Sequence, residues 1–313
     1  MKKERIVIAL GGNALQTDSN DCSALSQLEI ARKTAKPLVD LIEEGHEVII
    51  AHGNGPQVGR IVSVYEKTQD GMPFPECGAM SQGYIGYHLQ QSINDEMQNR
   101  GINKSVASVV TQVLVDKKDK SFNNPTKPIG AFYSEEEAEI LKKENGFTMM
   151  EDAGRGWRRV VPSPEPIDII ESPIVKTLVE AGHVVITVGG GGIPVVRKDN
   201  GNLEGVAAVI DKDFAAEKIS ETLDADYLII LTAVEKVSIN FNKPNQQNLS
   251  EINLKDAYRY IEEGHFAPGS MLPKVKAAIK FVESKPGRKV LITSLEKVKE
   301  GIEGKTGTVL VDK

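Results

Sequence analysis

The sequence predicts an α/β fold in which helices cover both faces of a mostly parallel β-sheet. Three segments, RIVIAL at 5–10, EVIIAH at 47–52 and HVVITV at 183–188, are continuously apolar, which is typical of strands buried on both faces. Glycines follow each of them and helical segments lie between them, so we expect the strands to run parallel. The chain has 313 residues, of which 40% are hydrophobic, enough for one large domain or two smaller ones.

The first two strands end in loops rich in glycine and asparagine. The strand at 5–10 leads to a helix predicted over 28–45, and the strand at 47–52 leads to the motif GNGPQVG. Ligands bind beyond the carboxyl ends of parallel strands, so these loops are expected to meet at one crevice. The loop residues are Gly11, Gly12, Asn13, Gly53 and Asn54. The GxGxxxG spacing, with no clear acid ending a following strand, argues against a dinucleotide-binding dehydrogenase.

The alternation of strands and helices stops between residues 116 and 164, a range that we name the lid segment. It is polar and punctuated by proline and glycine, and it is too long for a plain connection, so we expect a lid or a small inserted subdomain. A helix with a solvated, charged surface is predicted at 134–145. Three arginines, Arg155, Arg158 and Arg159, could bind an anion, but most of them are expected to pair with nearby acids.

Four consecutive glycines in VGGGGIPVV, at 188–196, follow the strand at 183–188. They have two interpretations: a sharp turn that only glycine allows, or a loop whose backbone approaches a phosphate directly. Convergence with the other two glycine loops favours the phosphate-binding interpretation. Further strands are expected at 226–232, 288–294 and 306–311, with a last helical turn between the final two.

Two lysines occupy positions where a cation is unfavourable unless an anion lies nearby. Lys212 stands between Asp211 and Asp213 at a strand-to-helix junction, and Lys274 lies in the first turn of a helix that follows GSMLP. The N-terminus of a helix already carries partial positive charge. Each lysine could be a solvated surface residue, with Asp211 a simple N-cap, but two such lysines together with glycine loops favour a phosphate site.

Composition excludes several other classes of function. The formal net charge of −6 argues against binding to nucleic acid or to an anionic membrane, and the first apolar run is too short for a signal peptide or a membrane span. Cys22 and Cys77 form neither a disulfide framework nor a zinc cluster and suit a cytoplasmic protein. The histidines show no metal-binding spacing, and only His52, beside Gly53, is expected near a ligand.

Eight short motifs, in order and over almost the whole chain, resemble those of the carbamate kinases, a group within the amino acid kinase family. They are ALGGNAL, HGNGPQVG, GAMSQGYIGYHLQQ, NNPTKPIG, GRGWRRVVPSP, GGGGIPVV, VIDKDFAAEK and GSMLPKVKAAI. The resemblance implies a three-layer αβα sandwich with an open, mainly parallel sheet and a protruding lid. Residues 1–165 would then hold carbamate, and residues 166–313 would hold the adenine nucleotide.

The resemblance also implies the reaction and its setting. Carbamate kinases transfer a phosphoryl group between ATP and carbamate with Mg²⁺, held mainly through the nucleotide phosphates. They are cytoplasmic homodimers and generally make ATP from ADP and carbamoyl phosphate. Whether the breakdown of arginine, agmatine or purines supplies the carbamoyl phosphate stays open from the sequence. Neither nucleic acid nor a membrane is an expected partner.

The matching motifs assign roles to individual residues. Lys212 and Lys274 match the lysines that hold the nucleotide phosphates and the transferring group, and Asp213 matches the aspartate that orients them. Lys127 matches a lid lysine that reaches the substrate on closure. The carbamate pocket would comprise Gly11, Gly12, Asn13, Gly53 and Asn54, and the phosphate and nucleotide site Gly189, Gly190, Gly191, Ala233, Val234, Met271 and Pro273. No residue is assigned as a metal ligand.

Two alternatives stay open from the sequence. One is another member of the same superfamily, with a different carboxylate or phosphate as acceptor, although the motifs NNPTKPIG and GAMSQGYIGY argue against it. The other is a catalytically silent nucleotide-binding subunit, although the retention of all three lysines and Asp213 argues against that.

Overall fold

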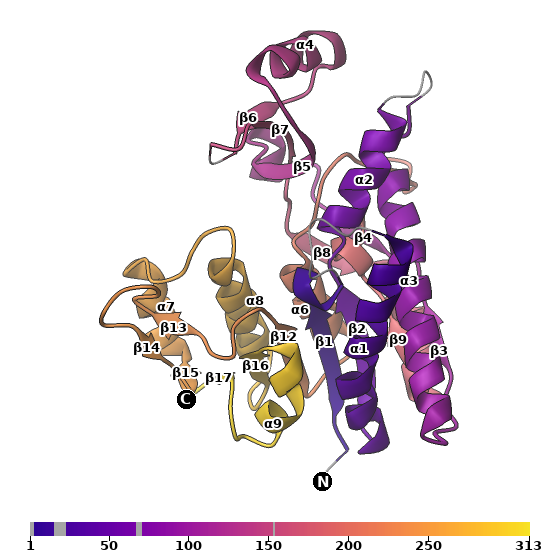
Figure 1. The fold of residues 1–313 in the computed structure, drawn as a ribbon, viewed down its shortest axis with the longest axis vertical. Helices are drawn as coiled ribbons and strands as arrows, with labels where there is room; N and C mark the ends of the chain where they lie inside the picture. Colours follow the sequence, from indigo (N-terminus) through magenta and orange to yellow (C-terminus); the bar gives the residue numbers. More distant parts are fainter. Residues whose placement is uncertain (1–2, 16–22, 67–70, 153) are drawn as a thin grey trace.

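The computed structural model describes residues 3–15, 23–66, 71–152 and 154–313, and its centre is a sheet of eight strands (Figure 1). From edge to edge the strands are β15 (Glu251–Asn253), β17 (Thr308–Val311), β16 (Lys289–Thr293), β12 (Tyr227–Leu231), β1 (Arg5–Leu10), β2 (Glu47–His52), β9 (Val184–Ile186) and β3 (Val106–Ser108). Neighbouring strands are parallel except β16 and β17, which are antiparallel. The predicted open, mainly parallel sheet is confirmed.

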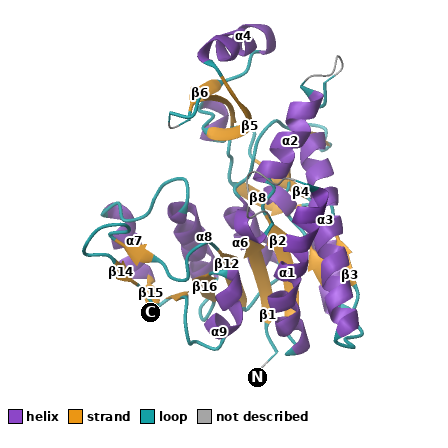
Figure 2. Cartoon of the chain, viewed as in Figure 1, coloured by secondary structure: helices purple, strands orange, loops and turns teal. Residues whose placement is uncertain are grey.

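Helices cover both faces of this sheet and complete a three-layer sandwich (Figure 2). On β1, Ile6 and Ile8 pack into one apolar cluster, whereas Val7 and Ala9 pack into a second cluster on the opposite face. This alternation follows from the two-residue period of a strand. The first face is covered by α1 (Ala24–Glu43), α3 (Phe74–Asn99) and α9 (Val298–Ile302), and the second by α5 (Ser172–Glu180), α6 (Lys212–Thr222), α7 (Leu254–Glu262) and α8 (Met271–Ser284).

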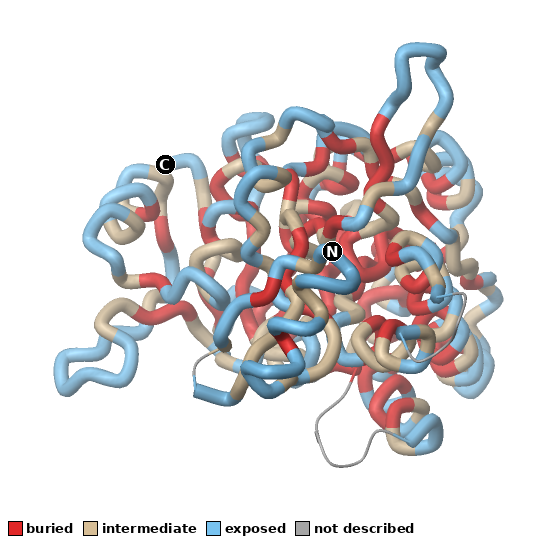
Figure 3. The backbone as a smooth tube through the Cα atoms, turned by 90° about the horizontal axis from the view of Figure 1, so that it is seen from above, coloured by how far each residue is buried: buried red, intermediate tan, exposed pale blue. Residues whose placement is uncertain are grey.

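The strands next to the loops of interest are buried from their second residue onward. Figure 3 shows buried stretches running through the middle of the molecule, with exposed stretches around them. Residues 6–10 of β1 are each 0% exposed, as are residues 49–51 of β2. Full burial of one such aliphatic side chain contributes about 1.5–3 kcal/mol. The loops at the ends of these strands therefore start from a well-fixed framework.

The lid segment contains a small sheet that stands apart from the central one (Figure 1). Its strands are β5 (Lys127–Tyr133), β7 (Trp157–Val161) and β6 (Met149–Glu151), and α4 (Glu135–Asn145) connects β5 to β6. The expected helix begins after Ser134, whose side chain accepts a hydrogen bond from Glu137 N while the Glu137 side chain accepts one from Ser134 N. This reciprocal capping explains why so charged a sequence forms a helix there.

The base of the lid segment packs against α2 (Gly55–Tyr65). The sequence did not predict this packing. Apolar side chains from α2, α3, β5 and β7 form a separate buried cluster, comprising Val58, Val62, Phe74, Cys77, Ile129 and Val161.

The predicted pairing of the arginines is confirmed. Arg155 and Arg158 each contact Asp152, at 2.8 and 3.3 Å, and Arg159 lies 3.7 Å from Glu66 at the end of α2.

Smaller elements complete the chain. A four-stranded sheet has the order β11 (Leu203–Gly205), β10 (Ile193–Arg197), β4 (Gln112–Val115) and β8 (Pro166–Ile169), and β13 (Ser238–Ile239) pairs with β14 (Gln247–Asn248). Short 3₁₀ turns span Gly12–Ala14, Lys120–Asn123, Gly189–Gly191 and Leu295–Lys297.

The order of the strands brings distant loops together. Because β9, β2, β1, β12 and β16 are mutually parallel, their carboxyl ends lie at the same edge of the sheet. β9 comes from the second half of the chain, yet it lies between β2 and β3, which come from the first. The glycine loop after β9 therefore lies beside the loops after β1 and β2.

Candidate active site

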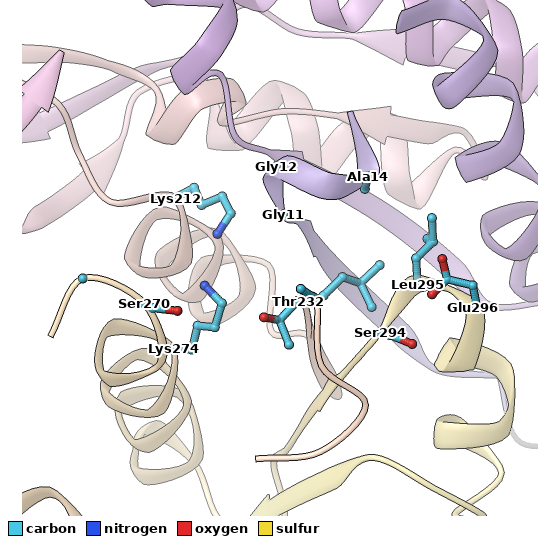
Figure 4. A pocket seen from close by; sticks show the side chains of 13 residues that line it. Gly11, Gly12, Ala14, Lys212, Thr232, Ser270, Lys274, Ser294, Leu295 and Glu296 are labelled. Carbon is cyan, nitrogen blue, oxygen red and sulfur yellow. The ribbon is translucent and has the colours of Figure 1, made fainter. Parts of the chain in front are cut away.

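Two lysines and one aspartate form a buried cluster at this edge of the sheet. Lys212 is the first residue of α6, and its Nζ donates a hydrogen bond of 2.8 Å to Asp213 Oδ1. Lys274, from the first turn of α8, donates one of 2.9 Å to Asp213 Oδ2. Figure 4 shows the two ammonium groups pointing toward each other across a cavity. Lys274 is thus brought from a distant part of the sequence to the adjacent pair Lys212 and Asp213, as predicted.

Burial and charge act in opposite directions on this cluster. Burial lowers the pKa of Lys212, but the charge and hydrogen bond of Asp213 outweigh burial and hold that pKa above its ordinary value. For Lys274, burial and the charge of Lys212 lower the pKa below its ordinary value. Burial opposes ionisation of Asp213, yet the two ammonium groups lower the pKa of its carboxyl. One carboxylate between two ammonium groups leaves an excess positive charge, which suits an incoming phosphate.

Asp211 links the cluster to the lid segment. One carboxylate oxygen accepts a hydrogen bond of 3.0 Å from Asp213 N and caps α6, as an N-cap aspartate should. The other oxygen lies 3.0 Å from Nζ of Lys127 on β5. Lys127 thus reaches the same end of α6 as the buried lysines, but its side chain is 39% exposed, compared with 12% for Lys274.

The four-glycine loop has a tightly packed backbone. Gly190 has φ 67° and Gly191 has φ 93°, both in the region that disfavours other residues. A Cβ at Gly190 would lie 2.1 Å from Asn54 Nδ2, and one at Gly191 would lie 2.2 Å from the carbonyl oxygen of Ile210. The turn interpretation of these glycines therefore has direct support, and it coexists with a position beside the lysine cluster.

A hydrogen-bonded pair supports the glycine loop from behind. The Gln82 side chain accepts from Thr111 N at 2.8 Å and donates to Thr111 O at 3.1 Å. The Thr111 hydroxyl in turn accepts from Val188 N, at 3.1 Å. Val188 has φ 44°, which is unfavourable for a β-branched residue. Gln82 falls within a motif that carries the family resemblance, but its supporting role was not predicted.

His52 supports this loop without facing an open cavity. Its side chain is 1% exposed, and its Nε2 lies 2.5 Å from where a Gly189 Cβ would be. Burial lowers the pKa of His52 to about 4, so the ring is neutral at physiological pH. His52 thus packs behind the glycine loop, and its closeness to a ligand stays a prediction.

Two cavities at the lysine cluster, of about 290 and 300 Å³, adjoin a third of about 430 Å³. Lys212 and Lys274 line both the first and the second, and Ala233 lines both the first and the third. The first is lined by Gly11, Gly12, Lys212, Ala233, Lys274 and the segment 294–296; the second by Gly53, Asn54, Lys127, Gly190, Asp213 and Pro273; and the third by Ala233, Val234, Phe241, Phe266 and Met271.

Most predicted site residues therefore line one continuous region, and a few do not. Gly190 lines the second cavity, whereas Gly189 and Gly191 are absent from all three linings because they pack against His52 and Ile210. Pro273 lies on the second cavity, not on the third with Met271. Asn13 belongs to the 3₁₀ turn after β1, and its side chain is outside the described part of the structure.

The arrangement suits the transfer of a phosphoryl group between two bound molecules. Phosphoryl transfer depends mainly on positioning and on neutralising charge over the moving group. Two ammonium groups between adjoining cavities can perform both tasks. Within the described ranges, no group of three or more His, Cys, Asp or Glu residues could hold a metal ion, and no helix is long and apolar enough to cross a membrane.

Comparisons with known proteins agree with this geometry. The model of the amino acid kinase family matches residues 4–294. The chain is 59% identical to a carbamate kinase of Clostridium perfringens and 59% identical to the carbamate kinase-like protein YqeA of Escherichia coli, in each case over 98% of this chain and 99% of the relative. The structure of a carbamate kinase from Giardia lamblia bound to AMP-PNP superimposes with a TM-score of 0.94 at 42% identity, covering 99% of both chains. The motifs, the sheet and these matches together show that the chain belongs to the amino acid kinase family.

Proposed function

We propose that this protein is a carbamate kinase, which transfers a phosphoryl group reversibly between ATP and carbamate. The observation that carries the proposal is the buried Lys212–Asp213–Lys274 cluster at the junction of two cavities. The high identity to a carbamate kinase over nearly the whole chain supports it. The phosphotransferase would act on a carboxyl group as acceptor.

Each cavity has a place in this proposal. The 430 Å³ cavity beside Val234 and Met271 would take the adenosine, and the 290 Å³ cavity would take the nucleotide phosphates. Carbamate would bind in the 300 Å³ cavity against Gly53 and Asn54. Residues 166–313 would supply most of the nucleotide side, although Gly11 and Gly12 also line the 290 Å³ cavity. Residues 1–165 would supply most of the carbamate side, including the lid segment.

The chemistry assigned to the chain is electrostatic. Lys212 and Lys274 would neutralise charge on the transferring group, and Asp213 would hold both ammonium groups in place. Lys127 would contact the substrate from the lid segment. Carbamate is already a nucleophile, so the reaction does not require a general base. One such cation can contribute a factor of about 10³–10⁵ to the rate of phosphoryl transfer.

We propose that Mg²⁺ enters with the nucleotide and is held mainly by phosphate oxygens. Both carboxylate oxygens of Asp213 are already engaged by lysines, so this residue is poorly placed to bind a cation. The ion would supply additional charge neutralisation at the phosphates. From the family resemblance given by the motifs, we also propose a cytoplasmic homodimer that works mainly toward ATP, with carbamoyl phosphate from the breakdown of arginine or a related nitrogen compound.

A coupled assay tests the proposal directly. The purified protein should form ATP from ADP and carbamoyl phosphate when Mg²⁺ is present, and the rate should fall sharply in Lys212→Ala. Acetyl phosphate in place of carbamoyl phosphate provides a control for the phosphoryl donor. Absence of turnover together with tight ADP binding would favour the silent nucleotide-binding subunit, an alternative of interest because one of the 59% identical relatives is named only carbamate kinase-like.

A further inference from the structure

A further cavity adjoins the site beneath the lid segment. It has a volume of about 550 Å³ and lies between α2 and β5. Asn54, Gly55 and Lys127 line both this cavity and the 300 Å³ cavity assigned to carbamate, so the two are continuous. We call the 550 Å³ cavity the vestibule. The other residues that line the vestibule have none of the roles assigned above.

The vestibule is lined by cationic side chains from three elements. Lys127 comes from β5, Arg60 from α2 and Arg158 from β7. No aspartate or glutamate is found among the described residues that line it. Asp211, which contacts Lys127, and Asp152, which contacts Arg158, both lie outside the lining. A cleft lined by charges of one sign raises the local concentration of ions of the opposite sign.

Arg158 retains capacity to bind an anion. Its Nη2 donates to the carbonyl oxygen of Gly130 at 3.1 Å, and its Nη1 makes a long contact of 3.3 Å with Asp152. Its Nε is buried, and no group in the described part of the chain forms a hydrogen bond with it. A guanidinium group offers several donors in a rigid plane that matches phosphate oxygens. The carbonyl contact also fixes the side chain at the wall of the cavity.

We propose that the vestibule is an entry site for a small phosphorylated dianion. Under the proposed function, which this inference extends, the dianion is the acyl phosphate substrate. It would be attracted by Arg60 and Arg158 and then pass along Lys127 to the buried lysines. The vestibule would raise the rate of capture without contributing to phosphoryl transfer, because its two arginines lie outside the cavities that adjoin the Lys212–Asp213–Lys274 cluster.

The chain offers a matched control for Arg158. Arg155 and Arg158 both contact Asp152, and both stack over the ring of Phe132, at 5.1 and 5.0 Å. Only Arg158 lines the vestibule. Comparing Arg158→Gln with Arg155→Gln therefore separates the effect of losing a charge at the vestibule from the effect of losing a charge that contacts only the lid segment.

Steady-state kinetics should distinguish these variants. We expect Arg158→Gln to raise the KM for carbamoyl phosphate about three- to tenfold, as suits the loss of one partly screened charge, with little change in kcat or in the KM for ADP. Its kcat/KM should also depend less on ionic strength than that of the wild type. Arg155→Gln should behave like the wild type, and Arg60→Gln, on the opposite wall, should behave like Arg158→Gln. Equal effects of the Arg155 and Arg158 substitutions would overturn the proposal.

A binding measurement tests the vestibule independently of catalysis. Inorganic phosphate is titrated with each protein in the presence of saturating AMP-PNP, and the broadening of its ³¹P resonance is recorded. Broadening should be equal for the wild type and Arg155→Gln and clearly reduced for Arg158→Gln and Arg60→Gln. Unchanged broadening in both of the latter variants would exclude the vestibule as a phosphate site. Absence of turnover in the wild type would refute only the proposed function, since this comparison requires no reaction.

Discussion

At the scale of single residues, Asp213 determines how two buried ammonium groups coexist. Its side chain is 2% exposed, and each of its oxygens holds one lysine. Without that negative charge, Lys212 and Lys274 would face each other in a poorly solvated space. Repulsion and burial would then both favour the loss of a proton.

Replacing Asp213 should therefore change the pH dependence of activity. In Asp213→Asn the pKa of Lys212 should fall, because burial continues to lower it while the opposing charge is gone. Activity that needs the protonated amine is present below this pKa and lost above it, so the alkaline limb of kcat should move to lower pH. Profiles from pH 6 to 10 measure the shift, and Asp224→Asn, which removes an exposed aspartate, is the control. An unmoved limb would contradict the role given to Asp213.

Substitutions of Lys127 and of Lys274 should have different effects on kcat and on ADP affinity. Lys274 lines the 290 Å³ cavity assigned to nucleotide phosphates, whereas Lys127 does not. Lys127→Ala should lower kcat by about a hundredfold or more, the scale for a cation acting in the transition state, while ADP affinity stays nearly constant. Lys274→Ala should weaken both. Calorimetric titration with ADP beside steady-state rates checks this, and equal losses of ADP affinity would place Lys127 in the nucleotide site.

At the scale of elements, the glycine loop lies close to the other glycine loops and also packs its own backbone tightly. The sequence could not show which of these two features requires glycine. Its place after a strand indicated closeness to the other glycine loops, and the structure agrees. The contacts of Gly190 with Asn54 and of Gly191 with Ile210 depend on tertiary packing and have no local signal. For the same reason the anchoring of β5 on α2 was missed, since residues from four elements form that cluster.

Because the loop is tightly packed, a substitution in it should lower the stability of the fold. A side chain at Gly190 that blocked only the phosphate would leave the fold intact, but the structure predicts a clash with Asn54. Gly190→Ala should therefore lower Tm more than Gly201→Ala, whose φ is also positive at 86° but whose surroundings are open. The control isolates the cost of φ alone, about 1 kcal/mol. Adding Asn54→Gly should restore part of the stability of Gly190→Ala, and no restoration would exclude the clash.

At the scale of the whole molecule, one buried carboxyl makes stability depend on pH. Glu217 on α6 is 2% exposed, and burial raises its pKa to about 7 from an ordinary value of 4.5. Its pKa is thus higher in the folded state than in the unfolded state. Its contribution to stability is complete below pH 4.5 and is lost as the pH rises through about 7.

Removing that titration should flatten the pH dependence of unfolding. Between pH 5 and 8.5 the wild type should lose up to about 3 kcal/mol that Glu217→Gln does not lose, an upper limit set by the difference between the two pKa values. Denaturant unfolding at several pH values measures this difference. Glu221→Gln, which alters a more exposed neighbour on the same helix, should follow the wild type. Parallel curves for all three proteins would show that Glu217 stays ionised when folded.

The position of β9 bears on whether the molecule can be divided. A cut between residues 165 and 166 would separate the proposed carbamate and nucleotide halves, yet β9 lies between β2 and β3 in the sheet. In the first fragment β2 and β3 would lose their pairing with β9 and β1 would lose its pairing with β12, whereas β9 in the second fragment would have neither of its neighbours. Unpaired strand edges of this kind promote aggregation. Each fragment should be insoluble when expressed alone, and co-expression should recover soluble, active protein by complementation. Through β9, each half of the chain completes the fold of the other.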